Sequence, residues 1–347
     1  MAKRVTIKDI ALALNTNSST VSRALNDSPL ISDQTKALVK KKALEMGYFP
    51  NSIARQLREG RSRIIGLVVP LINRAFFSNI IHGVESIARQ KGYQLLICQS
   101  NDDAGEEVSA LQTLRTQKVA GFIISQASNL VDEKIYKAII ADGTPIVMFD
   151  RVSTTLDVNK VVNANQEASS EAVRHLINQG YRRIVYFAGP QSLNIYQERF
   201  AGYRQALQEA GIPFDPALVF HDMLSRERGE EVMGTILATG LEFDAVASAS
   251  DFAGLGALLT MRNAGISVPG EKGLIGFANE SFTELVEMSS IEQFSIQMGE
   301  AAADLLFEDI EAKDSDEPLV HRQVVINPAL VLRKSSVRLA TGVQGTE

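Results

Sequence analysis

The sequence predicts a small all-α head of the helix-turn-helix type, followed by a larger α/β body built on parallel sheets. Three short helical patterns fill residues 1–49, and continuous apolar runs alternate with helical stretches from residue 62 onward. The length of 347 residues is a third observation, because it exceeds one typical domain. We therefore expect a helical domain at 1–49, a linker at 50–61 and a body at 62–347.

The head begins with an amphipathic pattern from residue 7 to about residue 14, for which Thr6 is the expected N-cap. Asn15 follows, and asparagine tolerates the left-handed turn that usually requires glycine. Asn17 or Ser18 can then cap a second helix. Two short helices joined by so tight a turn are typical of a helix-turn-helix.

A third helix, on which the first two can pack, starts after Ser32 or Asp33 and ends near Gly47. The spacing of apolar residues predicts which side chains of the three helices face inward. These are Ile7, Ile10, Ala11 and Leu14 in the first helix, Val21, Ala24 and Leu25 in the second, and Leu38, Val39 and Leu44 in the third.

The outer face of the second helix carries short hydroxyl side chains around one arginine, Arg23. Short side chains let a helix approach the major groove of DNA closely, and an arginine can donate two hydrogen bonds to guanine O6 and N7. We therefore expect this helix to read DNA. The residues of the head expected to contact DNA are Thr6, Asn17, Ser18, Ser19, Thr20, Ser22, Arg23, Asn26 and Ser32.

The charge of the chain is unevenly distributed, in the way expected when only the head meets a polyanion. Residues 1–63 contain 12 basic and 5 acidic residues, a net charge of +7. The whole chain carries −6, so the remainder carries −13. A basic surface without any partner is the plainer alternative on charge alone.

The body contains apolar runs that read as buried strands, each followed by a helical stretch. The runs are RIIGLVV, YQLLIC, GFIIS and PIVMFD, and then, after residue 162, RIVYFAG, DAVASAS and GLIGFA. Such strands indicate parallel sheets covered on both faces, and their repetition suggests two similar α/β lobes. Ligands in these folds bind beyond the carboxyl ends of the strands, here in a cleft between the lobes.

Several function classes find no support in the sequence. No Gly-rich phosphate loop, G-x-S-x-G elbow or metal-ligand spacing is present, so we expect neither an enzyme nor a metal or other cofactor. The single cysteine, Cys98, fits a reducing compartment. No run approaches the length of a membrane span, and the N-terminus lacks the apolar region of a secretory signal. We expect a cytoplasmic protein without a membrane partner.

Specific motifs then point to a family. VTIKDIALAL and SSTVSRALN in the head, GYFPNSIARQLREGRSRIIGLVVP after it, and PIVMFDR, HLINQGYRRIVYFAGP and ERFAGYRQAL in the body together resemble the LacI/GalR family of bacterial transcription regulators. The resemblance implies a two-lobed body like that of periplasmic sugar-binding proteins, with chain crossings near residues 162, 291 and 324. The first lobe would then comprise about 62–162 and 292–324, and the second about 163–291 and 325–338.

The resemblance also assigns a role to the linker. In the family this segment forms a hinge helix in the minor groove of DNA, where a leucine is wedged between base pairs. Leu57 matches the wedge, and Arg58 follows it towards the phosphates. Asn51 and Ala54 are the other expected DNA contacts in the linker. Without the family, Leu57 could equally be a linker residue that packs on the body.

The effector site is also implied by the resemblance. Asp150 can accept hydrogen bonds from ligand hydroxyls, and Arg199 matches an arginine that grips sugar hydroxyls or a carboxylate. The full set of expected effector contacts is Phe76, Phe77, Asp150, Arg199, Ser250, Asp251, Asn279 and Gln293. Taken alone, Arg199 could be a solvent-facing helix residue, Asp150 a cap at a strand end, and the two phenylalanines core residues.

The chain departs from the family pattern at three places in the site. Ser250–Asp251 replaces an Asn-Asp pair, and Ala278 and Ala164 stand where sugar-responsive members have aspartates. Fewer fixed anions favour a phosphorylated or carboxylated effector, such as a sugar phosphate or sugar acid, although a neutral sugar remains open.

The function that the sequence predicts is a DNA-binding regulator, most often a repressor in this family, acting on a palindromic operator as a homodimer under a small sugar-like effector. Two alternatives remain: the same regulator under a partner protein, and a solute-binding protein. The basic head and the missing secretory signal argue against the latter. The tail SSVRLATGVQGTE has no leucine heptad to support a tetramer.

Overall fold

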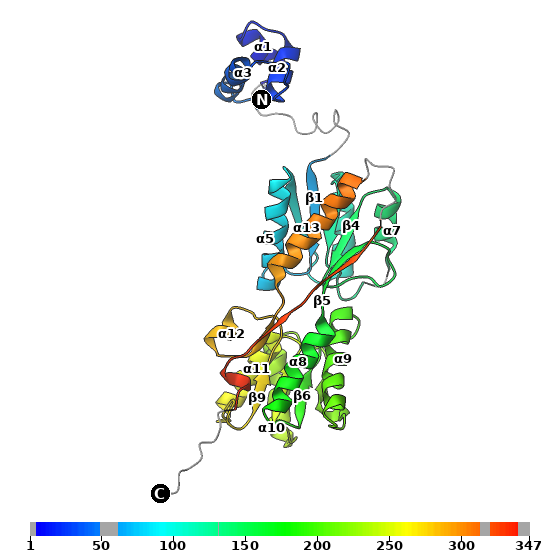
Figure 1. Cartoon of the computed structure of the whole chain (residues 1–347), viewed down its shortest axis with the longest axis vertical. Helices are drawn as coiled ribbons and strands as arrows, with labels where there is room; N and C mark the ends of the chain where they lie inside the picture. Colours follow the sequence, from blue (N-terminus) through cyan, green and yellow to red (C-terminus); the bar gives the residue numbers. More distant parts are fainter. Residues whose placement is uncertain (1–4, 49–61, 131, 313–319, 339–347) are drawn as a thin grey trace. The chain divides into compact units, whose positions relative to one another are not determined.

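The computed structural model describes residues 5–48, 62–130, 132–312 and 320–338. The chain divides into two compact units, Met1–Ser62 and Arg63–Glu347 (Figure 1). The first unit is the helical head, and the second is the α/β body. Each unit has hydrophobic clusters of its own, so each is held together by its own core.

The head consists of helices α1 (Ile7–Ala13), α2 (Ser18–Leu25) and α3 (Asp33–Glu45). Its helix starts are those that the local sequence predicts. Thr6 and Asp9 form a capping box on α1. Asn17 caps α2 by accepting a hydrogen bond of 2.7 Å from the Thr20 amide, and Ser32 caps α3. The turn before α2 passes through Asn15 with a φ of 49°, as expected for asparagine.

The inward face of α3 differs from the sequence-based prediction. Val39 is buried as expected, but Leu38 and Leu44 are 55% and 83% exposed, and Ala43 takes the inner position instead. Each residue advances a helix by about 100°, so positions 39, 43 and 46 form one narrow stripe, flanked by 38 and 44 on opposite sides. The core of the head accordingly contains Val39 and Ala43, with Met46 packed against them.

The body contains two parallel sheets. The first has the strand order β11-β5-β4-β3-β1-β2, and the second has the order β7-β6-β8-β9. The seven apolar runs of the sequence form strands of these sheets, while β5, β7 and β11 were not among them. The first sheet comprises β1 (Ile64–Val69), β2 (Gln94–Gln99), β3 (Phe122–Ile124), β4 (Ile146–Phe149), β5 (Asn159–Asn163) and β11 (Gln323–Ile326). The second comprises β6 (Ile184–Phe187), β7 (Val219–Phe220), β8 (Ala245–Ser248) and β9 (Gly273–Ile275).

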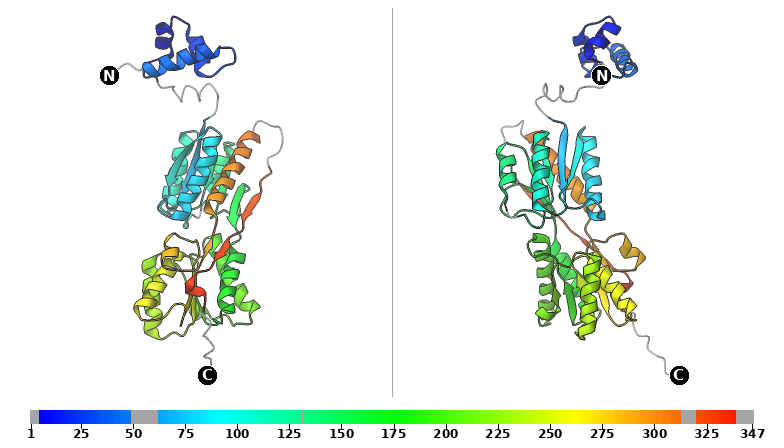
Figure 2. Two further views of the ribbon diagram at one scale, coloured as in Figure 1. Left: turned by 60° about the vertical axis from the view of Figure 1, so that its left-hand side comes forward. Right: turned by 180° about the vertical axis from the view of Figure 1, so that it is seen from behind.

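Helices cover both faces of each sheet, as Figure 2 shows. The first lobe has α5 (Ala75–Gln90) and α13 (Ser295–Ala312) on one face and α6 (Ala104–Thr116) and α7 (Lys134–Ala141) on the other. The second lobe has α8 (Asn165–Asn178) and α9 (Asn194–Glu209) on one face and α10 (Arg226–Thr239) and α11 (Asp251–Asn263) on the other. The short helices are α12 (Phe282–Leu285), η1 (Pro216–Leu218) and η2 (Lys334–Ser336).

The chain passes between the two sheets of the body three times. The crossings follow β5, follow the small strand β10 (Ser290–Glu292), and join β11 to β12 (Ala329–Val331). β10 and β12 pair antiparallel, and the continuous segment from β11 to β12 is visible in Figure 1. Because all strands within each large sheet are parallel, the carboxyl ends of each sheet gather on one edge, which places their loops together.

Close helix packing in the second lobe depends on glycine. A Cβ atom on Gly202 of α9 would lie 2.2 Å from the backbone oxygen of Gln166 on α8, so alanine there must push the two helices apart. Gly234 of α10 has open space around its Cα. We expect Gly202→Ala to lower the free energy of unfolding by about 1–3 kcal/mol, and the control Gly234→Ala to raise it by about 0.5–1 kcal/mol. Urea unfolding followed by circular dichroism tests the pair; equal effects of both variants would contradict the role of Gly202.

Candidate functional site

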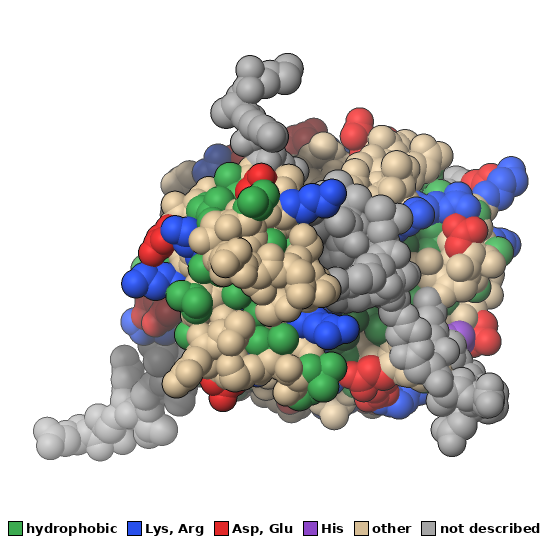
Figure 3. Space-filling model, turned by 90° about the horizontal axis from the view of Figure 1, so that it is seen from above, with side chains coloured by type: hydrophobic (Ala, Val, Ile, Leu, Met, Phe, Trp, Pro, Cys, Tyr) green, Lys and Arg blue, Asp and Glu red, His purple; other side chains and the backbone are tan. Residues whose placement is uncertain are grey.

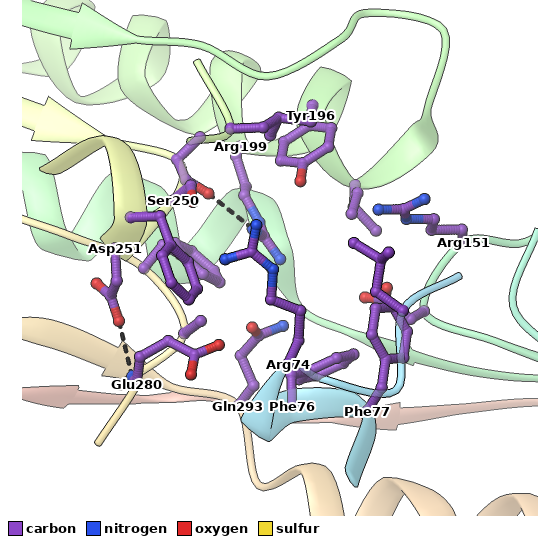
Figure 4. Close-up of a pocket in the computed structure, with 18 of the residues that line it drawn as sticks. Arg74, Phe76, Phe77, Arg151, Tyr196, Arg199, Ser250, Asp251, Glu280 and Gln293 are labelled. Carbon is purple, nitrogen blue, oxygen red and sulfur yellow. Dashed lines mark hydrogen bonds between the residues drawn. The ribbon is translucent and has the colours of Figure 1, made fainter. Parts of the chain in front are cut away.

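A pocket lies between the two lobes of the body, at the carboxyl ends of the strands (Figure 4). The first lobe contributes the loop after β1 with the start of α5, and the loops after β2 and β4. The second lobe contributes the start of α9 and the loops after β8 and β9. The lining residues are Leu71, Arg74, Phe76, Phe77, Asp102, Asp150, Arg151, Ile195, Tyr196, Arg199, Leu224, Ala249, Ser250, Asp251, Phe252, Phe277, Ala278, Glu280 and Gln293.

Arg199 enters the pocket from the second lobe. It is only 4% exposed, and contacts with its neighbours hold it in place. Its Nε donates to the Asn165 side chain at 2.9 Å, and one terminal nitrogen, Nη1, donates to the backbone oxygen of Ala249 at 3.0 Å. The guanidinium carbon lies 3.7 Å from the centre of the Phe277 ring. Burial lowers the pKa of Arg199, an effect that the nearby acidic groups oppose. Nη2 makes no hydrogen bond with another described residue.

Asp150 enters the pocket from the first lobe. Its carboxylate is buried and can still accept hydrogen bonds. It follows β4 with a φ of 56°, a backbone conformation that is uncommon outside glycine and concentrates at functional sites. Its side chain is 4% exposed, and its carboxylate accepts no hydrogen bond from another described residue. Burial raises the pKa of Asp150, and the charges of Arg151 and Arg199 oppose that rise.

Arg151, the next residue, has an unused donor. One of its terminal nitrogens forms a buried ion pair of 2.5 Å with Asp102, which follows β2. Its Nε, however, is buried and has no hydrogen-bond partner in the described part of the chain. A buried polar atom in that state costs free energy, so an acceptor supplied by a ligand would stabilise it.

A third arginine, Arg74, reaches across the pocket from the first lobe to the second. Its guanidinium carbon lies 3.6 Å from the centre of the Phe252 ring on α11. Glu280, from the loop after β9, faces the same place and interacts with Arg74 and with the Ala75 amide. Burial raises the pKa of Glu280, while these two groups oppose the rise.

Asn194 holds the two lobes together elsewhere in the body. Its side-chain oxygen accepts from the Val152 amide at 3.2 Å, and its side-chain nitrogen donates to the backbone oxygen of Asp150 at 3.3 Å. Because Asn194 belongs to the second lobe and the other two residues to the first, the arrangement of the lobes in this structure is tied directly to the backbone that carries Asp150.

Of the eight residues expected to contact an effector, seven line the pocket: Phe76, Phe77, Asp150, Arg199, Ser250, Asp251 and Gln293. Asn279 does not, because the backbone reverses through positive φ angles at Ala278 and Asn279 and turns this side chain away. The Asn279 amide donates to Glu292 at 2.8 Å and accepts from Arg333 at 2.9 Å, so it joins segments of the second lobe instead.

Sequence reasoning missed much of the charge in the pocket. Arg74, Asp102, Arg151, Tyr196, Phe252, Phe277 and Glu280 all line it but were not expected there. Most of them directly adjoin an expected residue or end a predicted strand, so the carboxyl-end rule could have found them. The sequence predicted fewer fixed anions than in a plain hexose site, and it did not anticipate the carboxylates that Asp102 and Glu280 add to the wall of the pocket.

Asp251 lines the pocket but its carboxylate is already engaged. It is fully buried, and it accepts hydrogen bonds from the Ser290 hydroxyl at 2.7 Å and the Glu280 amide at 2.9 Å. Burial raises its pKa to about 7, although both hydrogen bonds favour the charged form. Asp251 therefore stabilises the loop that carries Glu280 by accepting a hydrogen bond from its backbone. Among the described residues, no cluster of three or more His, Cys, Asp or Glu side chains could hold a metal ion.

The raised pKa of Asp251 predicts how the stability of the fold depends on pH. A carboxyl whose folded-state pKa is raised from 3.8 to about 7 stabilises the fold below pH 4 and loses that contribution as the pH rises to about 7. We expect wild type to lose stability relative to Asp251→Asn by up to about 1.4 kcal/mol per pH unit between pH 5 and 7, with no further change above pH 8. Urea unfolding of both proteins across this range measures it; parallel curves would contradict the assignment.

The head presents the second candidate surface. Arg23 is exposed on α2, close to exposed Ser19 and Asn26 and half-buried Ser18, Thr20 and Ser22. The Arg23 side chain makes no hydrogen bond or ion pair with another described residue, whereas lysines of α3 pair with Asp27, Asp33 and Glu45. In the view of Figure 3, Lys and Arg side chains are interspersed with Asp and Glu side chains. The expected contacts Asn51, Ala54, Leu57 and Arg58 lie outside the described residues.

Comparison with known families decides what these two units are. A model of bacterial regulatory proteins of the lacI family matches residues 6–51. A model of periplasmic binding proteins and the sugar binding domain of the LacI family matches residues 62–329. The chain belongs to the LacI family. It is a DNA-binding transcriptional repressor of that family, as its relatives also indicate.

Relatives of this LacI-family protein cover nearly its whole length. The repressor CytR of Escherichia coli (strain K12) is 31% identical over 310 residues, which are 89% of this chain and 90% of CytR. The regulator DegA of Bacillus subtilis (strain 168) is 30% identical over 341 residues, which are 97% of this chain and 100% of DegA. Both are named as HTH-type transcriptional regulators or repressors, not as enzymes.

Solved structures share the fold. A complex of the transcriptional regulator CelR with cellobiose has a TM-score of 0.72 and 29% identity, covering 96% of this chain and 100% of CelR. A Lac repressor dimer bound to operator and the anti-inducer ONPF has a TM-score of 0.84 and 23% identity, with the same coverage. In the described part of this LacI-family protein, no helix is long and apolar enough to cross a membrane.

Proposed function

We propose that this repressor binds a palindromic operator as a homodimer and is controlled by a small sugar-like effector in the pocket between its lobes. The observation that carries the effector proposal is the pair of unused polar groups in that pocket. Among the residues that the structure describes, the buried Asp150 carboxylate has no donor and the buried Arg151 Nε has no acceptor. A hydroxyl group both donates and accepts, so a polyhydroxylated ligand can satisfy both. The similarity to a regulator that was solved with cellobiose supports the same class.

The DNA-binding half of the proposal rests on α2. Its exposed face combines small polar side chains with the unpaired Arg23, a combination that suits a recognition helix in the major groove. One head offers too small an interface for high specificity, so two heads on two half-sites are expected. The proposed DNA contacts are those named from the sequence: the polar residues of the head together with Asn51, Ala54, Leu57 and Arg58 of the linker.

An exposed sheet edge supports the homodimer. β2 is an edge strand of the first sheet, and its Leu96 and Ile97 are 38% and 45% exposed. Long apolar edge strands are usually covered, since they otherwise invite aggregation. A second copy of the chain is the partner that we propose, and sedimentation at micromolar concentration tests it; a monomer there would contradict the dimer.

Control of DNA binding follows from the two-lobed site. Asp150 comes from the first lobe and Arg199 from the second, so a ligand that contacts both changes the free energy of one lobe arrangement relative to another. The linker leads from the first lobe to the head, and a short hinge helix forms only when two linkers meet at a suitable separation. The effector can therefore change operator affinity without touching DNA.

The experiment that tests the proposed function uses the full-length protein. Thermal-shift measurements with neutral sugars, sugar phosphates and sugar acids identify ligands that bind the folded state, because such ligands raise the melting temperature. Operator titrations with and without the best ligand then show whether it releases or promotes DNA binding. A ligand that stabilises the protein but leaves operator affinity unchanged would contradict effector control and favour a partner protein.

The linker makes a further prediction. We expect Leu57→Ala to lower specific affinity and reduce DNA bending, because an apolar wedge unstacks a base step and kinks the duplex. Non-specific, salt-dependent binding should remain close to wild type, since it depends on phosphate contacts. Fluorescence resonance energy transfer between the ends of an operator duplex measures the bend. Equal bending by the variant and wild type would show that Leu57 is not the wedge.

A further inference from the structure

Arg74 is the most unusual residue of the pocket. It occupies the N-cap position of α5, where a small hydrogen-bond acceptor is the usual choice, and no side chain of its own segment caps the helix. Its guanidinium instead extends over Phe252 of the other lobe. No carboxylate oxygen of another described residue forms an ion pair with Arg74 at 4.0 Å or less, so the guanidinium can bind the anionic group of a ligand.

The start of α5 already faces a carboxylate. Glu280 of the second lobe interacts with the Ala75 amide, at the end of the helix where the dipole favours negative charge. The Glu280 side chain therefore occupies a place that suits the carboxylate of a ligand. The positive charge of Arg74 also acts on Glu280, whose pKa it lowers.

A second cation faces this place from the opposite lobe. Figure 4 shows Arg74 and Arg199 entering the pocket from opposite sides. Two nitrogens of Arg199 are held by Asn165 and Ala249, and the remaining terminal nitrogen is unused by the described residues. A carboxylate between Arg74 and Arg199 would thus contact both lobes at once.

The rest of the pocket requires hydroxyl groups. The Asp150 carboxylate accepts no hydrogen bond from the described residues, and the buried Arg151 Nε donates none to them. A phosphate dianion would add two negative charges close to Asp150 and Glu280, whereas a carboxylate adds one. A neutral sugar would leave Arg74 with the charge of Glu280 nearby but with no ion pair within 4.0 Å among the described residues.

We propose that the effector is a sugar acid, a polyhydroxylated monocarboxylate whose carboxylate binds between Arg74 and Arg199 while its hydroxyls contact Asp150 and Arg151. This inference rests on the proposed function and narrows it to one ligand class. Arg74 is then the residue that selects acids over neutral sugars, and Glu280 competes with the ligand carboxylate.

The test uses the full-length protein at pH 7.5 with three matched sets of probes. The acids are D-galacturonate, D-glucuronate, D-mannuronate and D-gluconate, and they are compared with D-galactose, D-glucose and D-mannose and with the 6-phosphates of these sugars. Thermal shift ranks the probes, and isothermal titration calorimetry measures the best one. We expect an acid to raise the melting temperature more than its neutral and phosphorylated counterparts.

Three variants locate the carboxylate. Arg74→Gln should weaken binding of the acid by about tenfold or more and remove the preference for it over the neutral sugar. Arg89→Gln, at an exposed arginine on the same helix, should bind like wild type and so controls for charge and folding. Glu280→Gln should bind the acid more tightly, because a competing charge is gone. Because Glu280→Gln is expected to gain binding, it remains informative if Arg74→Gln is poorly folded.

The outcomes separate this inference from the proposed function. It is overturned if a neutral sugar or a 6-phosphate binds best, if Arg74→Gln binds the acid as wild type does, or if no acid stabilises the protein. A neutral sugar or phosphate that binds best and also alters operator affinity would leave effector control intact while refuting the sugar acid. Failure of every probe to change operator affinity would refute effector control itself.

Discussion

Arg199→Ala is expected to abolish the effector response while leaving operator affinity of the unliganded protein within about threefold of wild type. The reason is position. Arg199 belongs to the second lobe, is held toward the pocket by Asn165 and Ala249, and stacks on Phe277. Removing it takes away the only arginine that the described part of the second lobe contributes to the pocket lining. A ligand then has little left with which to distinguish one lobe arrangement from another.

The variant also has a structural cost that the experiment must separate from the functional one. Loss of two hydrogen bonds leaves buried acceptors unpaired, which lowers stability by about 2–4 kcal/mol. Operator titrations should therefore run well below the melting temperature, with Arg204→Ala as the control. Arg204 lies on the same helix but is exposed, so its loss should leave the response intact. If Arg199→Ala still responds at the wild-type effector concentration, the effector binds elsewhere or a partner protein performs the switch.

Arg23→Ala is expected to weaken operator binding by about 1–3 kcal/mol per half-site and to relax the preference at one symmetric base pair. Arg23 is exposed on α2, in the last turn of the helix, and no described residue competes for its guanidinium. A bidentate contact with guanine carries sequence information, whereas a phosphate contact does not. Binding to operators altered at each position, measured at one salt concentration, would locate the base pair.

Lys41→Ala is the matched control for Arg23. It removes one positive charge from the exposed surface of α3 in the same head, so any effect should be uniform across DNA sequences and sensitive to salt. A footprint over one asymmetric half-site, or an unchanged base preference in Arg23→Ala, would show that α2 does not read the operator in the proposed way.

Local features of the fold were predictable because they depend on neighbouring residues. Thr6, Asn17 and Ser32 cap helices through bonds to amides three residues on, and that spacing is legible in a sequence. Apolar runs bounded by helical stretches gave the main strands for the same reason. Five strands were missed, since none of them lies in one of the seven apolar runs: β5, β7, β10, β11 and β12.

The pocket could be predicted only in outline. Asp150 and Arg199 were expected there through the family resemblance, and the structure places both in the lining. Nothing local indicates that Arg74 lies over Phe252 or that Glu280 reaches the start of α5, because each contact joins residues far apart in the chain. Asn279 illustrates the opposite error: a positive φ turned it out of the pocket and into contacts with Glu292 and Arg333.

The sequence by itself therefore determined the helix caps, the main strands, the division into a basic head and an acidic body, and the family. These follow from local bonding, from periodic burial and from motifs carried in short segments. Only the tertiary structure decided which face of α3 is buried, and which charges meet in the pocket. Both depend on how separate elements pack: rotation of a helix by 100° exchanges Leu44 for Ala43, and the pocket exists only where loops from two lobes converge.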